Sequence, residues 1–269
     1  MSVQILLVGC GKMGRAMLDG WLTTGSVDRI VVVEPSQPAD KPSDDRVQFV
    51  VDAGDIPSDF APSLMVVAVK PQVIEGVLPT YRRLVDKGAA VLSIAAGTPI
   101  RTFQAHFGDG AVIVRAMPNT PAAIGQGTSV LVASANASPA QKAMAEQLIA
   151  AVGSVEWVDD EGLIDAVTAL SGGGPAYVFL LVECLAEAGR EAGLPADMSL
   201  RLARSTVIGS GALLDAQEEP AETLRRNVTS PAGTTEAALR VLMDQKSGIS
   251  PIITRAIAAA ADRSRELAD

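Results

Sequence analysis

The chain has few of the side chains from which most catalytic and metal sites are built. Its 269 residues include a single histidine, His106, and two cysteines, Cys10 and Cys184, that form no CxxC pair. We therefore expect no metal site, because no cluster of ligand-type residues has the required spacing. The isolated cysteines also give no sign of a disulfide framework, and they favour a reducing, cytoplasmic location.

Excess positive charge and long apolar runs are missing as well. Lys and Arg total 22 against 31 Asp and Glu, for a net charge of −9. Nucleic-acid binding requires basic patches, so we expect no nucleic-acid partner. No apolar run is long and uninterrupted enough to predict a membrane span. The short apolar stretch before Cys10 lacks the positive flank of a leader, so a soluble protein is predicted.

Aromatic residues make up 3% of the chain although hydrophobic residues make up 48%, so the core is built from Ala, Val, Leu and Ile. Short apolar strands alternate with helices in the first part, which predicts parallel βαβ units with helices on both faces. Beyond residue 160 no convincing strand remains. We expect a Rossmann-like doubly wound sheet over residues 1–159 and an all-helical domain over residues 160–269, whose size and apolar content are typical of a dimerisation domain.

The strongest motif is Gly9-x-Gly11-x-x-Gly14, between a predicted strand at 3–8 and a predicted helix at 13–22. In such a motif the glycines allow a tight turn, close approach of a pyrophosphate and close packing of the helix. Glu34 ends the second strand, 20 residues after Gly14, in the place of the acidic residue of a dinucleotide fingerprint. The alternative is a purely structural glycine turn.

Three further strand ends have unusual sequences: residues 68–71, 94–97 and 117–121. The carboxyl ends of parallel strands share one edge, where ligands of such sheets bind. Hydride transfer from a nicotinamide needs little acid–base machinery from the protein. The scarcity of such groups therefore favours reduction of an already electrophilic group over oxidation of an alcohol.

Two loops of the helical half resemble anion sites. Residues 171–177 open a helix with small residues, beginning at Ser171, and residues 227–235 open another with several hydroxyls. Backbone N–H groups at a helix start, together with Ser and Thr hydroxyls, can hold a carboxylate. The alternative for each loop is an ordinary helix cap.

Together these segments resemble the pyrroline-5-carboxylate reductase family over nearly the whole chain. The stretch 224–242, with Ser230-Pro231-x-Gly233-x-Thr235 at its centre, is the most specific part. The resemblance implies NADPH- or NADH-dependent reduction of 1-pyrroline-5-carboxylate to L-proline, the last step of proline synthesis. It also implies a homodimer, and in such families the dimers often assemble into larger rings.

The resemblance implies roles for individual residues. The expected substrate-binding residues are Ser230, Gly233, Thr234, Thr235 and Ser171, and Thr235 is the expected catalytic residue, hydrogen-bonded to the ring nitrogen. The expected cofactor-binding residues are Gly9, Gly11, Lys12, Met13, Gly14, Glu34, Pro35, Ser36, Ala68, Val69, Lys70, Pro71, Ala95, Ala96 and Asn119.

The chain departs from the family pattern at Gly173, Ala232 and Glu34. Alanine at 232 replaces a glycine and is strained if that position has a positive φ. Many relatives carry Ser or Thr in place of Glu34, whereas an acidic residue binds the ribose 2′-OH and repels a 2′-phosphate. We expect better use of NADH than is usual in the family, unless Glu34 turns away and leaves Ser36 and Lys41 to accept a phosphate.

Two alternatives stay open. One is a related imine or hydroxyacid reductase; hydroxyacid dehydrogenases of this plan normally carry a catalytic lysine on the helix that opens the second domain, and residues 175–192 contain none. The other is a regulator that binds NAD(P)H without turnover, for which the hydroxyl-rich loop at 229–235 would have little use.

Overall fold

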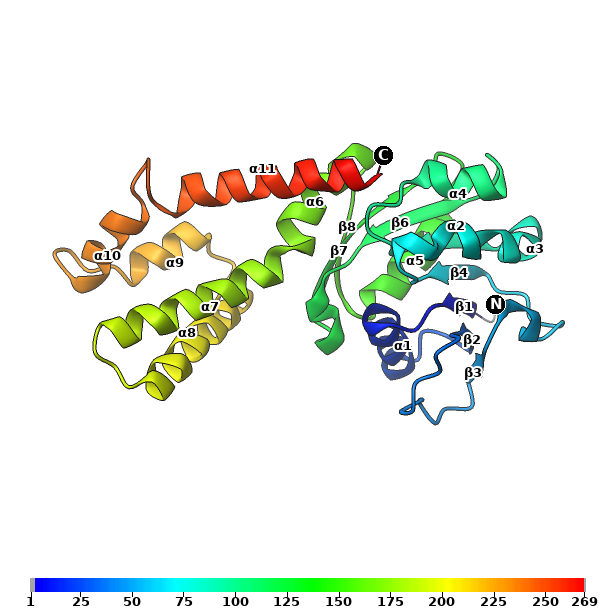
Figure 1. Ribbon diagram of the computed structural model, residues 1–269, viewed down its shortest axis with the longest axis horizontal. Helices are drawn as coiled ribbons and strands as arrows, with labels where there is room; N and C mark the ends of the chain where they lie inside the picture. Colours follow the sequence, from blue (N-terminus) through cyan, green and yellow to red (C-terminus); the bar gives the residue numbers. More distant parts are fainter. Residues whose placement is uncertain (1–2, 269) are drawn as a thin grey trace. The chain divides into compact units, whose positions relative to one another are not determined.

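The computed structural model describes residues 3–268, which divide into two compact units (Figure 1). Unit 1 contains residues 3–173 and 260–268, and unit 2 contains residues 174–259. The end of the last helix thus belongs to the first unit. The predicted domain boundary at 159/160 stays a prediction, since the contacts divide the chain at Gly173.

Unit 1 is built on an eight-stranded sheet in the order β3-β2-β1-β4-β5-β6-β7-β8. All neighbouring strands pair in parallel except β6 and β7, which are antiparallel. The strands are β1 Gln4–Val8, β2 Arg29–Val33, β3 Val47–Val50, β4 Leu64–Val67, β5 Ala90–Ser93, β6 Ile113–Met117, β7 Gly127–Ala133 and β8 Gly153–Trp157. The predicted Rossmann-like sheet is confirmed.

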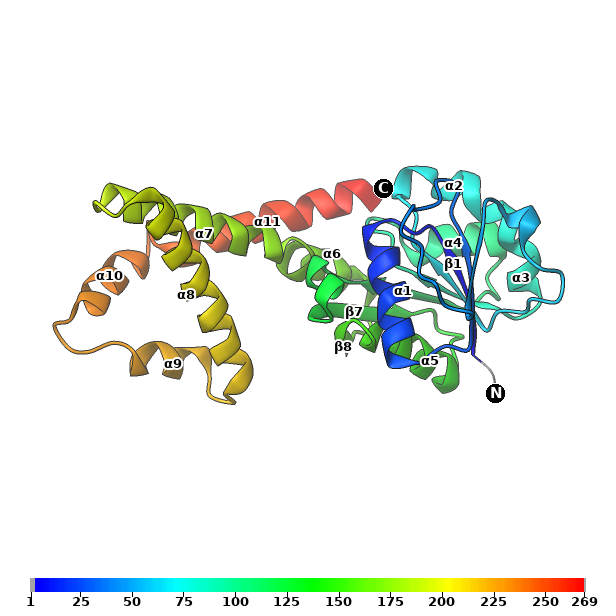
Figure 2. The same ribbon diagram turned by 90° about the horizontal axis from the view of Figure 1, so that it is seen from below.

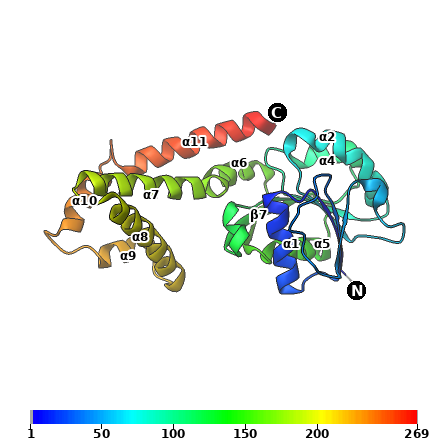
Figure 3. The ribbon, with the colours of Figure 1, turned by 60° about the horizontal axis from the view of Figure 1, so that its bottom comes forward.

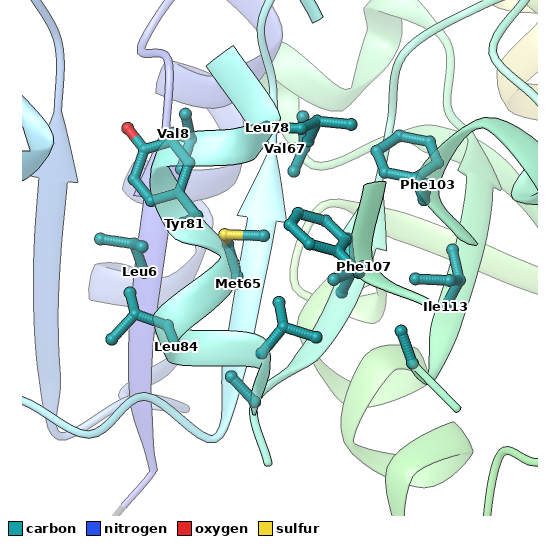
Figure 4. Close-up of a cluster of buried hydrophobic side chains, with 14 of the residues drawn as sticks. Leu6, Val8, Met65, Val67, Leu78, Tyr81, Leu84, Phe103, Phe107 and Ile113 are labelled. Atoms are coloured by element: carbon teal, nitrogen blue, oxygen red, sulfur yellow. The ribbon is translucent and has the colours of Figure 1, made fainter. Parts of the chain in front are cut away.

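Apolar residues on alternate faces of each central strand explain why the sheet is buried on both sides. In β1, Leu6 and Val8 belong to one core cluster and Ile5 and Leu7 to the other. Figure 4 shows the first cluster, in which strand residues pack against aromatic and aliphatic side chains of the covering helices, among them Phe103.

Helices cover both faces (Figures 2 and 3). One face packs against α1, Lys12–Thr24, and α5, Pro139–Ala150. The other packs against α2, Ile74–Val77, α3, Arg82–Asp86, and α4, Ile100–Phe107. The helical segment after β4 is not continuous: α2 and α3 alternate with 3₁₀ turns at Pro71–Val73 and Leu78–Tyr81. Pro79 explains the break, because a proline removes a backbone donor and disturbs the preceding turn.

Unit 1 ends in a short helical series. A 3₁₀ turn, Glu161–Leu163, leads into α6, Ile164–Val167, and then into a π-helical stretch, Thr168–Gly172. The last turns of α11, Ile249–Ala268, are tied to this unit at two places. Ser264 Oγ donates to Asp165 Oδ1 at 2.6 Å, and Arg101 Nη2 donates to the carbonyl of Ala268 at 2.8 Å.

Unit 2 is entirely helical in its described residues and leaves much of its apolar surface exposed. It contains α7 Gly174–Glu191, α8 Ala196–Ala216, α9 Ala221–Asn227, α10 Thr234–Leu242 and the first part of α11. None of the side chains of α7 is buried within the chain, and Phe179 is 62% exposed. Exposed apolar area on this scale indicates an interface.

One continuous helical segment, Glu161–Glu191, is apolar and long enough to cross a membrane by length and composition alone. The sequence expectation that no such segment exists was therefore too strict. A helix that buries its apolar face against a second protein chain passes the same test. The charged residues Glu183, Glu187 and Arg190 on α7 are better suited to an interface between chains than to lipid.

Candidate functional site

The glycine turn lies at the carboxyl edge of unit 1, where β1 lies between β2 and β4 and the strand order reverses. A dinucleotide binds at such a switch point in sheets of this topology. The strand ends that follow β1, β2, β4, β5 and β6 all reach this edge, because these strands run in parallel. The edge therefore gathers the segments singled out in the sequence.

Each glycine of the turn has a separate structural reason. Gly9 has a φ of 91°, and a Cβ there would lie 2.8 Å from Val69 Cγ1. A Cβ on Gly14 would lie 2.6 Å from the carbonyl oxygen of Gly9, so the glycine lets α1 pack against the turn. A Cβ on Gly11 would meet nothing within 4 Å. No contact among residues 3–268 requires a glycine at 11, and the open space there fits a bound pyrophosphate.

The first turn of α1 also suits an anion. Gly11 is the N-cap residue, and no side chain caps the helix start. The backbone N–H groups of the first turn therefore remain available, and the helix dipole favours negative charge at this end. Lys12 is exposed at the start of the helix and Met13 is half-buried. The residues present fit a dinucleotide phosphate.

Glu34 follows β2 and is held by two backbone donors. Its Oε2 accepts from the N–H of Cys10 at 2.7 Å, and its Oε1 accepts from the N–H of Ser36 at 3.0 Å. Burial, and then the charge of Glu34, raise the pKa of the Cys10 thiol to about 11. The thiol therefore stays neutral beside the phosphate turn at physiological pH, whereas a thiolate would repel phosphate.

The segments after β4 and β5 are placed at the same edge. Lys70 is exposed, and Pro71 begins the 3₁₀ turn after it. Ala95 is buried and its N–H donates to Ser93 Oγ at 3.3 Å, whereas Ala96 is exposed. The loop after β5 thus offers a short, exposed backbone to a ligand.

Asn119 and Ser171 come together although 52 residues separate them. Asn119 Nδ2 lies 3.3 Å from both the carbonyl oxygen and Oγ of Ser171, and its Oδ1 accepts from the N–H of Thr128 at 2.9 Å. Ser171 lies in the π-helical stretch, a feature frequent at functional sites. Sequence reasoning assigned these two residues to different ligands, and it did not foresee their contact.

Sequence reasoning also missed an ion pair between a buried arginine, Arg115, and a glutamate, Glu161, whose side chain is 30% exposed. Arg115 Nη1 donates to Glu161 Oε1 at 2.8 Å, and the same oxygen accepts from the N–H of Ile100 at 2.8 Å. Arg115 is 4% exposed, and its Nη2 makes no hydrogen bond within the described residues. The pair joins β6, the start of α4 and the start of the helical series. The only local signal was an arginine in an apolar strand.

In unit 2, the loop before α10 has the strain expected from its sequence. Ala232 has a φ of 56°, the one positive value among the described residues other than glycine. Its N–H donates to Glu236 Oε2 at 2.7 Å. A Cβ on Gly233 would lie 2.4 Å from Ser230 Oγ, so only glycine lets the serine hydroxyl approach this closely.

Gly233 is the N-cap of α10, and no side chain caps that helix start. Thr234 and Thr235 form its first turn. The loop therefore combines a serine hydroxyl, two threonines and backbone donors at a helix start, which suits a small carboxylate.

The two sites define the class of the protein: a dinucleotide-dependent oxidoreductase with a separate helical unit. Comparison with protein families agrees. Residues 3–97 match the family "NADP oxidoreductase coenzyme F420-dependent", and residues 161–267 match "Pyrroline-5-carboxylate reductase dimerisation".

Full-length relatives specify the family. The chain is 38% identical to a pyrroline-5-carboxylate reductase of Pseudomonas aeruginosa, over 99% of this chain and 97% of the relative. It is also 38% identical to one of Synechocystis, over 99% of both chains. The chain belongs to the pyrroline-5-carboxylate reductase family.

Solved structures agree with this result. A pyrroline-5-carboxylate reductase from Coxiella burnetii superposes with a TM-score of 0.90 at 32% identity, covering 100% of both chains. A pyrroline carboxylate reductase from Plasmodium falciparum with NADP bound gives a TM-score of 0.83 at 25% identity, covering 99% of this chain and 98% of the other.

Proposed function

We propose that this chain reduces the C=N bond of 1-pyrroline-5-carboxylate with NADH or NADPH and forms L-proline. Full-length identity to pyrroline-5-carboxylate reductases carries the proposal, because it spans both the glycine turn and the loop before α10. The reaction adds a hydride to the imine carbon and a proton to the nitrogen. The bound dinucleotide supplies the hydride.

In unit 1, the residues of the carboxyl edge hold and orient the dinucleotide. The turn at Gly9, Gly11 and Gly14 and the first turn of α1, with Lys12 and Met13, bind the pyrophosphate. Glu34, Pro35 and Ser36 contact the adenosine ribose. The nicotinamide end is bound by the remaining cofactor residues at this edge: Ala68, Val69, Lys70, Pro71, Ala95, Ala96 and Asn119.

In unit 2, the loop before α10 holds the substrate. Ser230 and the backbone of Gly233 and Thr234 bind the carboxylate, for which the serine hydroxyl and the α10 start are suited. The Thr235 hydroxyl hydrogen-bonds the ring nitrogen and assists its protonation. Ser171 is the remaining residue that we propose for substrate binding. Orientation accounts for most of the rate, because a protonated imine is already electrophilic.

The protein acts as a homodimer through unit 2. The match to a dimerisation family and the exposed apolar side chains of α7 and α8 support this assembly. We extend the proposal to a ring of dimers and to a cytoplasmic location. Cross-linking followed by mass measurement tests the ring.

The reaction is tested by following loss of reduced nicotinamide absorbance when 1-pyrroline-5-carboxylate is added, with chromatographic identification of proline. Replacing Thr235 by Val should lower kcat by about 100-fold, within the usual contribution of proton-transfer groups, whereas Thr235→Ser should keep most activity. Thr223→Val in α9 is the matched control. Folded protein that binds NADH but never oxidises it would contradict the proposal.

Related reductases of the same plan are less consistent with the structure. Structures of prephenate dehydrogenase and of a reductive aminase share the fold, with TM-scores of 0.55 and 0.57 at 15% and 17% identity. These resemblances concern the fold alone. The helix that opens unit 2, α7, contains no lysine, so it lacks the base that hydroxyacid dehydrogenases of this plan place there.

A further inference from the structure

Glu34 is fixed in place on several sides. Besides the carboxylate bonds to Cys10 and Ser36, its own N–H donates to the carbonyl of Val50 at 3.1 Å, at the end of β3. Gly9 is tied to the end of β2, directly before Glu34, since its N–H donates to the carbonyl of Val33 at 2.9 Å. The side chain therefore forms part of the glycine turn and cannot swing away without breaking two hydrogen bonds.

The end of β2 is where a sheet of this topology binds the adenosine ribose. A carboxylate accepts a hydrogen bond from a ribose 2′-OH, which is a donor. A 2′-phosphate offers only acceptors and about two negative charges, so it repels a carboxylate at this place. Discrimination between NADH and NADPH then depends on whether a nearby cation compensates the negative charge of the 2′-phosphate.

The nearby cations are engaged elsewhere. Arg15 Nε donates to Asp19 Oδ1 at 2.8 Å, and its Nη1 donates to Asp40 Oδ2 at 3.1 Å. Lys41 donates to Gln37 Oε1 and lies over the Phe49 ring, 5.5 Å from the centroid. Lys12 begins α1 at the pyrophosphate turn, so it serves both dinucleotides equally.

The backbone donor in reach of a 2′-phosphate is also occupied. The N–H of Ser36 already donates to Glu34 Oε1. The sequence left Ser36 and Lys41 as possible contacts of a 2′-phosphate; in this structure the Ser36 N–H and the Lys41 ammonium both have other partners.

We propose that the chain selects NADH over NADPH, and that Glu34 is the specificity-determining residue. The selection arises because a fixed carboxylate accepts the ribose hydroxyl and excludes the phosphate. This inference rests on the proposed function only in the kinetic test, where 1-pyrroline-5-carboxylate serves as the hydride acceptor. It concerns a preference between dinucleotides, which binding alone can measure.

The kinetic test compares kcat/KM for NADH and NADPH with 1-pyrroline-5-carboxylate as acceptor. Wild-type protein should favour NADH by about 10-fold or more, the scale of one unfavourable charge contact. Glu34→Ser should shift the ratio toward NADPH by about 10-fold or more. Glu34→Gln keeps the shape and removes the charge, so its ratio should lie between the two. Asp45→Ser removes a carboxylate from the same loop that forms none of these contacts, and its ratio should match wild type.

The binding test uses 5′-AMP and 2′,5′-ADP in calorimetry, and each variant is first checked by thermal unfolding. Wild-type protein should bind 5′-AMP more tightly, and Glu34→Ser should reverse or abolish that preference. Should Glu34→Ser fail to fold, Glu34→Gln carries the comparison. Equal affinity of wild-type protein for the two nucleotides, or an unchanged ratio in a folded Glu34 variant, would overturn the inference. If wild-type protein prefers 5′-AMP to 2′,5′-ADP but does not reduce 1-pyrroline-5-carboxylate, the proposed function is contradicted and the inference about Glu34 stands.

Discussion

The two units differ in how their apolar residues are buried. In unit 1 the large side chains of the sheet and its helices are enclosed by the unit itself, and Phe103 is 0% exposed. In unit 2 the helices carry comparable side chains on the outside, as Phe179 shows at 62% exposure. The first unit can fold by its own core, whereas the second requires another chain to bury its surface. The proposed cofactor site therefore lies in a self-sufficient unit, and the proposed substrate loop lies in a unit that depends on assembly.

The largest expected effect comes from placing a charge on the apolar surface of unit 2. Phe179→Asp should weaken self-association by roughly 100-fold or more, since an unpaired charge would enter an apolar interface. Activity should fall with it, while NADH binding by unit 1 persists. Sedimentation velocity over a range of concentrations measures the association. Gln72→Asp, at an exposed position of unit 1, is the matched control. If Phe179→Asp dimerises as tightly as wild type, the apolar surface of unit 2 around Phe179 is not the dimer interface, and the contrast between the two units is contradicted.

Truncating one phenylalanine in each unit sharpens the same contrast. Phe103→Ala should destabilise unit 1 by about 3–5 kcal/mol, the usual cost of a large cavity in a core. This loss should be independent of protein concentration. The loss caused by Phe179→Ala should instead depend on concentration, because Phe179 is exposed within the chain and we expect it to pack against the partner. Denaturant unfolding at two well-separated concentrations measures both, and concentration dependence in both variants would contradict the contrast.

The partly buried ion pair of unit 1, between Arg115 and Glu161, gives the next largest effect. Glu161→Ala leaves the Arg115 guanidinium buried without a partner and removes the acceptor for Ile100, so we expect a loss of about 3 kcal/mol. A surface pair provides the comparison. Arg29 and Asp59 lie 3.0 Å apart with side chains 34% and 73% exposed, and Asp59→Ala should cost less than about 1 kcal/mol.

The Glu161 experiment also separates structure from catalysis. Glu161 fixes the start of α4, just after the loop at Ala95 and Ala96. The kcat of Glu161→Gln should therefore fall even under conditions where the variant is fully folded, because the loop is less well positioned. Steady-state kinetics at a temperature where the variant is fully folded measures this. Unchanged kcat would confine the pair to a structural role.

Features dictated by local chemistry could be predicted from the sequence. The glycine turn and the alternation of strands and helices each follow from a few neighbouring residues, and the structure contains both. The strain at Ala232 was expected from the family resemblance, in which a glycine takes this place, and the structure contains it as well. Features that depend on long-range pairing could not. The Arg115–Glu161 pair joins residues 46 apart. The sequence also gave no signal for the short edge strand β3, with its partly polar pattern, or for the antiparallel pairing of β7.

The smallest expected effect concerns the strained loop of unit 2. Here the direction of the change in unfolding free energy is more informative than its size. Ala232 occupies a left-handed backbone conformation at φ 56°, which disfavours any residue with a Cβ. Ala232→Gly should therefore stabilise the protein by about 0.5–1 kcal/mol, after allowing for the greater freedom of glycine in the unfolded chain. Ala237→Gly, inside α10, should destabilise by a similar amount. Thermal unfolding of the two variants side by side measures the difference. If both substitutions destabilise, the hydrogen bond from the N–H of Ala232 to Glu236 holds the loop without significant strain. The loop proposed to bind the carboxylate would then be as well adapted to alanine as to glycine.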